Sequence, residues 1–329
     1  MPFSGELTEA IESLVRGNNN IKEIDINAKA ISKKYRENDN DGKRLVTSTG
    51  EAIAYALSRM PATYEVVASV MGNIFDINKF EINSILDVGA GTGAAIWAMY
   101  DNYNFQRYTC LEREQEMINI GKELMKSSDI SNLVIWKQFD AITDSIDNQE
   151  DLVITSYMIN ELPKNKVDVV IEKLWNATKK VLVIIEPGTP RGYSNIIHIR
   201  NYLLNKNGHI IVPCPHEKEC KLAQDDWCQF ACRIQRNKIH KKLKDGSSPF
   251  EDEKYSYIAF SKDIVERAPN RILRHPIINK GFSEYKVCMV DDIKDIKLSK
   301  KDGNIYKEAK KKSAGDYLNI WFVLRRNGG

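Results

Sequence analysis

A short apolar segment, Ser84–Val88, leads directly into the glycine-rich sequence GAGTGAAIWAMY. Glycine allows the positive φ angles of a tight turn and lets the backbone come close to a ligand. The residues that follow predict a helix, whose first N–H groups are free to bind that ligand. This strand, turn and helix restrict the fold more than any other segment, because they form one unit of a sheet that is covered by helices.

Strands and helices continue to alternate around this turn. The next strands are predicted at residues 108–111, 133–137, 151–156 and 181–185, and helices at residues 6–17, 47–74, 115–127 and 166–178. Pro61 would start or kink a second helix within residues 47–74. We therefore predict an α/β fold with a parallel, doubly wound, Rossmann-like sheet preceded by N-terminal helices.

The pattern changes after residue 186, where a turn-rich stretch leads to a helix near residues 194–205. A cysteine-rich loop follows at residues 212–232, and then RIQRNKIHKKLK, a candidate basic helix. The segments YSYIAFS, YKVCMVD and YLNIWFVLRR predict strands by their aromatic and β-branched content. We expect a helical segment at 1–80, a cofactor-binding domain at 81–205, and a smaller, mostly β module with the cysteine loop at 206–329.

The two parts of the chain differ in charge. Residues 1–184 contain 20 Lys and Arg against 27 Asp and Glu, whereas residues 185–329 contain 28 against 18. A basic C-terminal part suggests contact with a polyanion such as RNA, and two ordinary solvated surfaces are the alternative. The candidate contacts form two groups, Arg233, Arg236, Lys238, Lys241, Lys242 and Lys244 in one, and Lys307, Lys310, Lys311 and Lys312 in the other.

The apolar runs of the chain are far shorter than the roughly 18 residues that span a bilayer, so no membrane contact is expected. The N-terminal sequence has no basic region followed by a long apolar stretch, and its early glutamates do not suit a transit peptide. We expect a cytoplasmic protein, with the mitochondrial matrix as the alternative. Six cysteines in a reducing compartment are not expected to form disulfides.

Acidic residues at the ends of the next two strands strengthen the prediction of a cofactor pocket at the glycine turn. Glu112 comes 25 residues after Asp87, where a carboxylate can accept hydrogen bonds from two ribose hydroxyls. Asp140 follows the third strand, within reach of an adenine amino group. The alternative is a turn needed only for packing, with Glu112 solvated. The predicted cofactor-binding residues are Asp87, Gly89, Gly91, Gly93, Glu112 and Asp140.

Three cysteines lie close together in a turn-rich loop, with the spacing C-x5-C-x7-C at Cys214, Cys220 and Cys228. A metal centre needs a fourth ligand, and Cys288 is the best candidate, with Cys232 and His216 as alternatives. Structural zinc usually uses paired C-x2–4-C turns, which are missing from this loop, so the wide spacing favours a [4Fe–4S] cluster over zinc. Cys110 and Cys232 are interpreted as small buried apolar residues.

The segments LDVGAGTG, YTCLERE and WKQFDA resemble those of the class I S-adenosylmethionine-dependent methyltransferases. This resemblance implies that S-adenosylmethionine occupies the predicted cofactor pocket. Enzymes that methylate exocyclic amines of bases commonly carry Asp/Asn-Pro-Pro-aromatic after the fourth strand, and this chain has SYMINEL there. We assign no catalytic residue. Glu161 in this segment could line the pocket or cap the helix that follows. Arg191 and Tyr193 lie at the edge where such enzymes admit substrate, with structural turn roles as the alternative.

Several segments together resemble one family, the methyltransferase-like proteins associated with the small subunit of the mitochondrial ribosome and their bacterial relatives. The segments are YALSRMPATYEVV, LDVGAGTGAA, SYMINELP, EPGTPRGY, VPCPHEKECKLAQDDWCQF and EDEKYSYIAFS. The resemblance implies a [4Fe–4S] cluster on Cys214, Cys220, Cys228 and Cys288. Near the C-terminus the family tends to carry Trp-Gly-Asp, of which this chain keeps only Gly315 and Asp316.

The family resemblance also implies a role on small-subunit ribosomal RNA in ribosome assembly or translation. We predict a methyltransferase-like protein that acts on this RNA, with the small ribosomal subunit as partner and no DNA. The alternative is a non-catalytic RNA-binding assembly factor, in which the cofactor and the cluster, or a structural zinc, stabilise the fold. A radical enzyme is the least favoured, because such enzymes leave one iron without a cysteine ligand.

Overall fold

The computed structural model describes residues 4–17, 21–36, 42–222, 225–235 and 248–318. Its centre is an eight-stranded sheet in the order β3-β2-β1-β4-β5-β8-β6, with β7 paired to β8. Strands β1 to β5 are parallel, and β8 runs antiparallel to β5, β6 and β7. The strands are β1 (Ser84–Val88), β2 (Arg107–Glu112), β3 (Val134–Gln138), β4 (Glu150–Ser156), β5 (Thr178–Pro187), β6 (His209–Val212), β7 (Phe230–Gln235) and β8 (Phe250–Ser261).

Both faces of this sheet are buried, as the apolar sequences of its strands require. Ile85 packs with the N-terminal helices, α5 and α6, whereas its neighbour Leu86 packs with α7 and α8 on the opposite face. Successive side chains of a strand point to opposite faces, so a continuous apolar strand contributes to both cores. These helices are α5 (Ala94–Asn102), α6 (Gln115–Met125), α7 (Val167–Ala177) and α8 (Pro190–Leu204), and the short 3-10 turns between elements are η1 (Asp129–Asn132), η2 (Ile159–Glu161) and η3 (Lys164–Lys166). The predicted α/β, Rossmann-like sheet is confirmed, but the expectation of a parallel sheet is wrong, because the sheet is mixed and β8 pairs antiparallel with β5, β6 and β7.

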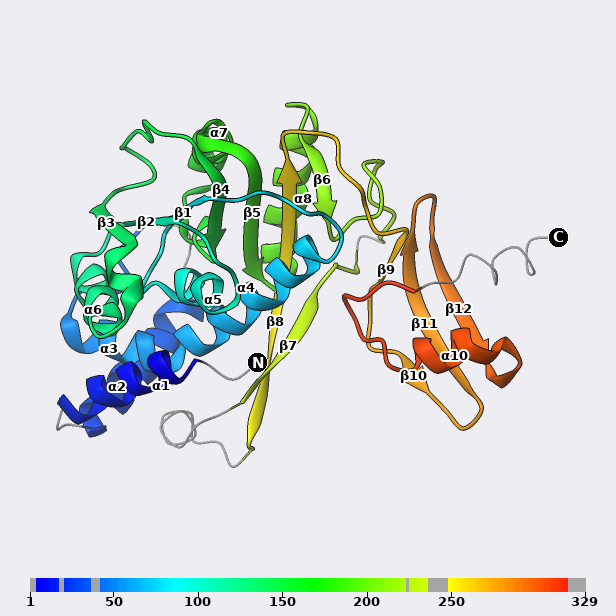
Figure 1. The fold of residues 1–329 in the computed structure, drawn as a ribbon, viewed down its shortest axis with the longest axis horizontal. Helices are drawn as coiled ribbons and strands as arrows, with labels where there is room; N and C mark the ends of the chain where they lie inside the picture. The colour runs from blue at the N-terminus through cyan, green and yellow to red at the C-terminus, as the bar shows by residue number, and fades with distance from the viewer. Residues whose placement is uncertain (1–3, 18–20, 37–41, 223–224, 236–247, 319–329) are drawn as a thin grey trace.

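Four helices precede the sheet and lie along one of its faces (Figure 1). They are α1 (Gly5–Gly17), α2 (Ile21–Arg36), α3 (Thr49–Ser58) and α4 (Met60–Phe75). The predicted second helix begins at Met60, and Pro61 occupies its first turn, where a missing N–H costs nothing. The sequence did not predict α2, whose mean hydropathy is low. None of the described helices is both long and apolar enough to cross a membrane.

The main sheet continues past residue 205, where we expected a separate module to begin. Strands β6, β7 and β8 all join it, and β8 pairs with β5 from Val181↔Ser261 to Pro187↔Tyr255. The segment YSYIAFS forms the second half of β8, and all of its side chains are buried, those of successive residues on opposite faces of the sheet. In the predicted basic helix, residues 233–235 belong to β7, and residues 236–247 lie outside the described part of the chain.

A second, smaller sheet forms the C-terminal β module, which lies beside the main sheet (Figure 1). Strand β11 pairs with β9, β10 and β12. Its small core includes Tyr285, Val287 and Leu298, covered by Tyr306 of α10. The elements are β9 (Asn270–Ile272), β10 (Ile277–Ile278), β11 (Phe282–Met289), β12 (Ile293–Ser299), η4 (Lys300–Asp302) and α10 (Gly303–Ala309). The predicted strand YLNIWFVLRR lies mostly in residues 319–329, which are not described.

Candidate functional site

The glycine turn after β1 has the backbone conformation that its sequence predicts. Gly89, Gly91 and Gly93 have φ angles of 75°, 58° and 85°, a region that favours glycine. A Cβ on Gly89 would lie 2.7 Å from Cγ of Met158, and one on Gly93 would lie 2.6 Å from Cε of Met125. The turn therefore needs glycine both for its φ angles and for close packing.

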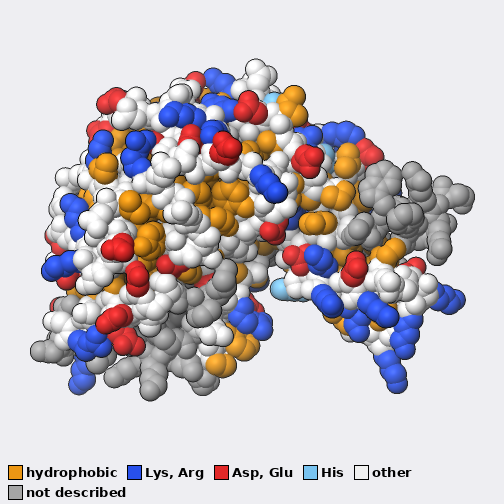
Figure 2. Space-filling model, in the orientation of Figure 1, with side chains coloured by type: hydrophobic (Ala, Val, Ile, Leu, Met, Phe, Trp, Pro, Cys, Tyr) orange, Lys and Arg blue, Asp and Glu red, His pale blue; other side chains and the backbone are white. Residues whose placement is uncertain are grey.

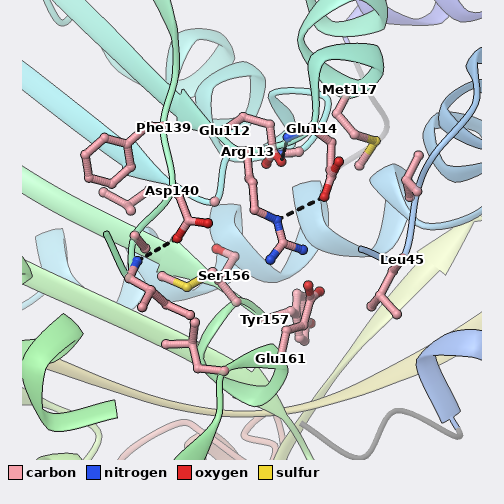
Figure 3. A pocket seen from close by; sticks show the side chains of 18 of the residues that line it. Leu45, Glu112, Arg113, Glu114, Met117, Phe139, Asp140, Ser156, Tyr157 and Glu161 are labelled. Carbon is pink, nitrogen blue, oxygen red and sulfur yellow. Dashed lines mark hydrogen bonds and ion pairs between the residues drawn. The ribbon is translucent and has the colours of Figure 1, made fainter. Parts of the chain in front are cut away.

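A pocket opens beside this turn, at the carboxyl ends of β1, β2 and β4. It contains about 790 Å³ of empty space, including its open mouth. Figure 3 shows Glu112, Arg113 and Glu114 on one side, Phe139 and Asp140 on another, and Ser156, Tyr157 and Glu161 between them. In open α/β sheets, ligands bind where the strand order reverses, which here is the gap between β1 and β4.

The six residues predicted to bind a cofactor lie close to one another, but they differ in position. Gly89, Gly91, Glu112 and Asp140 line the pocket. The other two do not: Gly93 begins α5 and packs on Met125, and Asp87 is buried next to the pocket. Both carboxylate oxygens of Asp87 have no hydrogen-bond partner among the described residues. Burial, with a smaller contribution from the charge of Glu112, raises the pKa of Asp87 to about 8.

Glu112 connects the end of β2 to the glycine turn. Its Oε2 accepts a hydrogen bond of 2.7 Å from the Gly91 N–H, and its Oε1 accepts one of 2.9 Å from the Glu114 N–H. Burial raises the pKa of Glu112, and these N–H groups act in the opposite direction by stabilising the carboxylate. The buried carboxylate is therefore held at the pocket wall in a fixed orientation.

One part of the pocket, the segment before α3 with its contacts to Arg113, was not predicted from the sequence. Arg113 donates to the backbone oxygens of Gly42 (2.9 Å) and Lys43 (3.2 Å), and so holds the segment before α3 across the pocket. Leu45 and Val46 of that segment line it. On the opposite wall, Asp140 Oδ1 accepts a hydrogen bond of 2.8 Å from the Ile142 N–H (Figure 3). The two contacts of Arg113 join residues 71 and 70 positions apart, so local sequence patterns carry no sign of them.

The segment after β4 closes the pocket and contacts α8. Tyr157 is a non-glycine residue with a φ of 66°, a strained conformation that often occurs at functional sites. Asn160 accepts a hydrogen bond of 3.3 Å from Arg191 at the start of α8. Glu186, fully buried, accepts one of 3.0 Å from Asn195, and burial raises its pKa to about 8. Glu161 lines the pocket, and Arg191 ties the two elements together.

The four predicted cysteine ligands line a second, mostly apolar pocket between α8, the loop after β6 and the C-terminal module. Cys214, Cys220 and Cys228 come from the loop, and Cys288 comes from β11. Tyr193 of α8, which we expected at a substrate entrance, instead contacts Cys220, with 3.3 Å between Oη and Sγ. The pocket also includes His216, whose Nε2 lies 3.8 Å from Cys288 Sγ.

The lining of the cysteine pocket distinguishes the candidate fourth ligands, because it includes Cys288 and His216 but not Cys232. Cys232 lies on β7 near Glu253. Burial raises the pKa of Cys214, Cys228 and Cys288, and the neighbouring cysteines contribute to each shift. As placed, no three His, Cys, Asp or Glu side chains of the described residues form a group that could hold a metal ion. The metal loop is therefore not confirmed, although a set of four thiols in one pocket has the chemistry of a metal–thiolate site.

The strand order and the glycine-turn pocket define a Rossmann-like, class I methyltransferase fold. The chain belongs to the family described as "Mitochondrial small ribosomal subunit Rsm22", whose model matches residues 49–319. This agrees with the family resemblance of the sequence.

The chain is similar to two kinds of curated protein. It is 25% identical over 245 residues to the human "Ribosome assembly protein METTL17, mitochondrial", a match that covers 69% of this chain and 52% of the human protein. It is 24% identical over 266 residues to the fission yeast Schizosaccharomyces pombe "Rsm22-cox11 tandem protein 2, mitochondrial", covering 68% of this chain and 33% of the relative. The chain thus spans about half or less of the length of these relatives.

Solved methyltransferase structures have low similarity to the chain. The Synechocystis magnesium protoporphyrin IX methyltransferase with bound SAM is 11% identical, with a TM-score of 0.40, and the match covers 72% of this chain and 97% of that one. The plantazolicin methyltransferase BpumL is 11% identical, with a TM-score of 0.43, covering 74% and 98%.

Proposed function

We propose that this chain is an S-adenosylmethionine-dependent methyltransferase that acts on small-subunit ribosomal RNA during ribosome assembly or translation. The observation that carries the proposal is the pocket at the switch point of the sheet, where Gly89, Gly91, Glu112 and Asp140 meet. When bound, S-adenosylmethionine supplies a methyl group on a positively charged sulfonium. Asp87 and Gly93 would shape the turn from beneath, and we assign no catalytic base.

The chemistry of the pocket suits this cofactor. Glu112 would accept hydrogen bonds from the ribose hydroxyls, and Asp140 would accept one from the adenine amino group. Phe139 presents an aromatic ring on the same wall as Asp140, suited to contact the flat face of the base. The acidic groups around the pocket favour a ligand that carries a sulfonium and an ammonium group.

We propose that Cys214, Cys220, Cys228 and Cys288 hold a [4Fe–4S] cluster, with zinc as the alternative. All four thiols line one pocket, and this pocket excludes Cys232. Bound metal would tie the loop after β6 to β11 of the C-terminal module. A structural centre of this kind adds its binding free energy to the stability of the fold.

The proposed partner is the small ribosomal subunit, and the proposed location is the mitochondrion rather than the cytoplasm that the sequence favoured. The matched family and the curated relatives carry mitochondrial ribosome names, which support both proposals. Lysine and arginine side chains cover much of the visible face of the C-terminal module (Figure 2). The exposed lysines of this module include Lys294, Lys297, Lys300, Lys301, Lys307, Lys310 and Lys311, which could contact phosphates.

The test compares S-adenosylmethionine binding, RNA binding and methyl transfer for the wild type and Asp87→Asn. Isothermal titration measures binding of S-adenosylmethionine. Binding of small-subunit ribosomal RNA is measured directly, and transfer of label from radiolabelled cofactor to that RNA measures methyl transfer. Methyl transfer by the wild type that is lost in the variant supports the enzyme. Cofactor binding without methyl transfer, with RNA binding unchanged in the variant, supports the non-catalytic assembly factor. A wild type that binds no cofactor contradicts both.

A further inference from the structure

Two arginines are buried beside the cysteine pocket. Arg200 of α8 is 1% exposed and Arg271 of β9 is 2% exposed, and both line the same pocket as the four cysteines. A guanidinium remains charged at any physiological pH. The structure therefore places two permanent positive charges, away from water, at the wall of this pocket.

Neither arginine has a carboxylate partner among the residues that the structure describes. Arg200 Nη2 donates to the backbone oxygens of His216 (3.2 Å) and Lys218 (2.5 Å), and its Nη1 donates to the side-chain oxygen of Asn201 (3.3 Å). Arg271 donates to the backbone oxygens of Pro213 (3.1 Å) and Gly315. All of these acceptors are neutral.

One side-chain nitrogen of each arginine has no hydrogen-bond partner within the described part of the chain. These are the Nε of Arg200 and the Nη2 of Arg271. The nearby Arg274 differs, because it pairs with Asp226 and is less buried. The two buried arginines thus have both uncompensated charge and unused hydrogen-bond capacity.

Burying an isolated charge is costly unless a charge of opposite sign lies close by. The cysteines of the pocket are the groups beside these arginines that can become negative. Protonated thiols leave both positive charges uncompensated, whereas thiolates that ligate a metal supply negative charge. Four thiolates around a zinc ion, or around a [4Fe–4S] core of charge 2+, give a centre of charge 2−, which two arginines balance.

We propose that Arg200 and Arg271 are the built-in counter-charges of a metal–thiolate centre at Cys214, Cys220, Cys228 and Cys288. The inference rests on the metal centre of the proposed function. Loading the centre releases the four thiol protons to solvent, and the arginines stabilise the dianion that results. They act as positioning residues for the centre and also fix its loop through the carbonyls of Pro213 and His216.

The test uses Arg200→Met and Arg271→Met, which remove the charge at similar length, and the matching Lys variants, which keep it. Arg233→Met, which breaks an exposed pair with Asp252, is the control. Each protein is reconstituted anaerobically with ferric iron, sulfide and a thiol reductant, which together supply the two ferric and two ferrous ions of the 2+ core, and separately with zinc. Metal retention against a chelator and the melting temperature with and without metal are then measured.

We expect the Met variants to hold metal about 10- to 100-fold more weakly, the usual range for partners of metal ligands. Their melting temperature should fall when loaded and stay the same or rise when metal-free, because an uncompensated charge has been removed. The Lys variants and Arg233→Met should retain metal. A role only in fixing the loop would instead lower both melting temperatures and make Lys behave like Met.

Wild-type loading by the Met variants, or equal destabilisation of the loaded and metal-free forms, overturns the inference. If the wild type takes up neither iron nor zinc, the proposed metal centre fails. The melting temperatures of the metal-free proteins then test only whether the charges of the two buried arginines are uncompensated. A higher melting temperature in the Met variants supports this, and a lower one contradicts it.

Discussion

The two pockets of this protein differ in the charged side chains that surround them, mainly acidic in the first, which also includes Arg113, and basic in the second. The first pocket, at the glycine turn, is lined by the carboxylates of Glu112, Glu114, Asp140 and Glu161, with Asp87 buried beside it. The cysteine pocket has buried arginines and thiols on its wall. On the proposed function, the first pocket would take a cation-bearing molecule and the second an anionic metal–thiolate centre.

The pockets also differ in how the chain builds them. The first lies almost entirely within the Rossmann-like part, and its glycine turn and acidic residues follow consecutive strands. The cysteine pocket joins α8, the loop after β6, β9 and β11, which belong to both sheets. The first pocket thus needs the main sheet and the N-terminal segment that crosses it, whereas the second also requires the C-terminal module to dock.

The largest effect is expected from a substitution that disrupts the cysteine pocket and leaves the first pocket intact. Cys220→Ser should lose nearly all metal and lower the melting temperature, because a serine hydroxyl is a poor ligand for a soft metal. S-adenosylmethionine binding should change much less. Metal analysis and thermal unfolding measure the two properties. Cys232→Ser, outside the pocket, should keep the wild-type metal content, and full metal content in Cys220→Ser contradicts the ligand assignment.

A second substitution breaks the first pocket alone. Glu112→Gln removes a carboxylate that can accept two ribose hydrogen bonds, and bonds to a charged acceptor contribute about 1.5–3 kcal/mol each. We expect S-adenosylmethionine to bind about 10- to 100-fold more weakly in titration calorimetry, with metal content unchanged. The control is Glu123→Gln on the exposed face of α6. Unchanged affinity in Glu112→Gln places the cofactor elsewhere.

The buried acid between the pockets should make stability depend on pH. The pKa of Glu186 is raised from its ordinary value of 4.5 to about 8, so the fold favours the protonated form. Its contribution is full below about pH 4.5 and is lost as the pH rises through 8. Between pH 4.5 and 8, Glu186→Gln should reduce the fall in melting temperature with rising pH. A residual slope should remain from Asp87, whose pKa is also raised. An unchanged slope shows that Glu186 stays ionised.

The smallest effect is expected from a substitution among the exposed lysines of the C-terminal module, which line neither pocket. Lys310→Ala should weaken RNA binding two- to threefold and lower the slope of log affinity against log salt by about 1, because one phosphate contact is lost. Filter binding at several salt concentrations measures both. Lys122→Ala, on α6 of the main sheet, should leave the affinity unchanged. Equal losses in the two variants show that binding depends on overall charge.

Local patterns predicted the first pocket better than the second. Glycines, an acid after β2 and an acid after β3 follow from strand-to-helix connections that are short in sequence. The sequence also selected the four cysteines that line one pocket, but it gave no sign of Arg200 and Arg271. Their roles depend on contacts between a helix and a strand about 70 positions apart. The sequence alone also does not distinguish a buried arginine from a solvated one. Tyr193 illustrates the same limit, because its neighbour Cys220 is 27 positions away.

Helix α8 lines the cysteine pocket and contacts the segment after β4, whose neighbouring residues line the first pocket, so it is the element that would couple the two sites. Its first turn holds the segment after β4 through Arg191, and its later turns present Tyr193 and Arg200 to the cysteines. If metal loading shifts this helix, the affinity for the ligand of the first pocket changes by some factor. Binding equilibria are reciprocal, so that ligand must then change the affinity for metal by the same factor. Where that factor favours binding, a cell that supplies too little of one ligand would lower the occupancy of both.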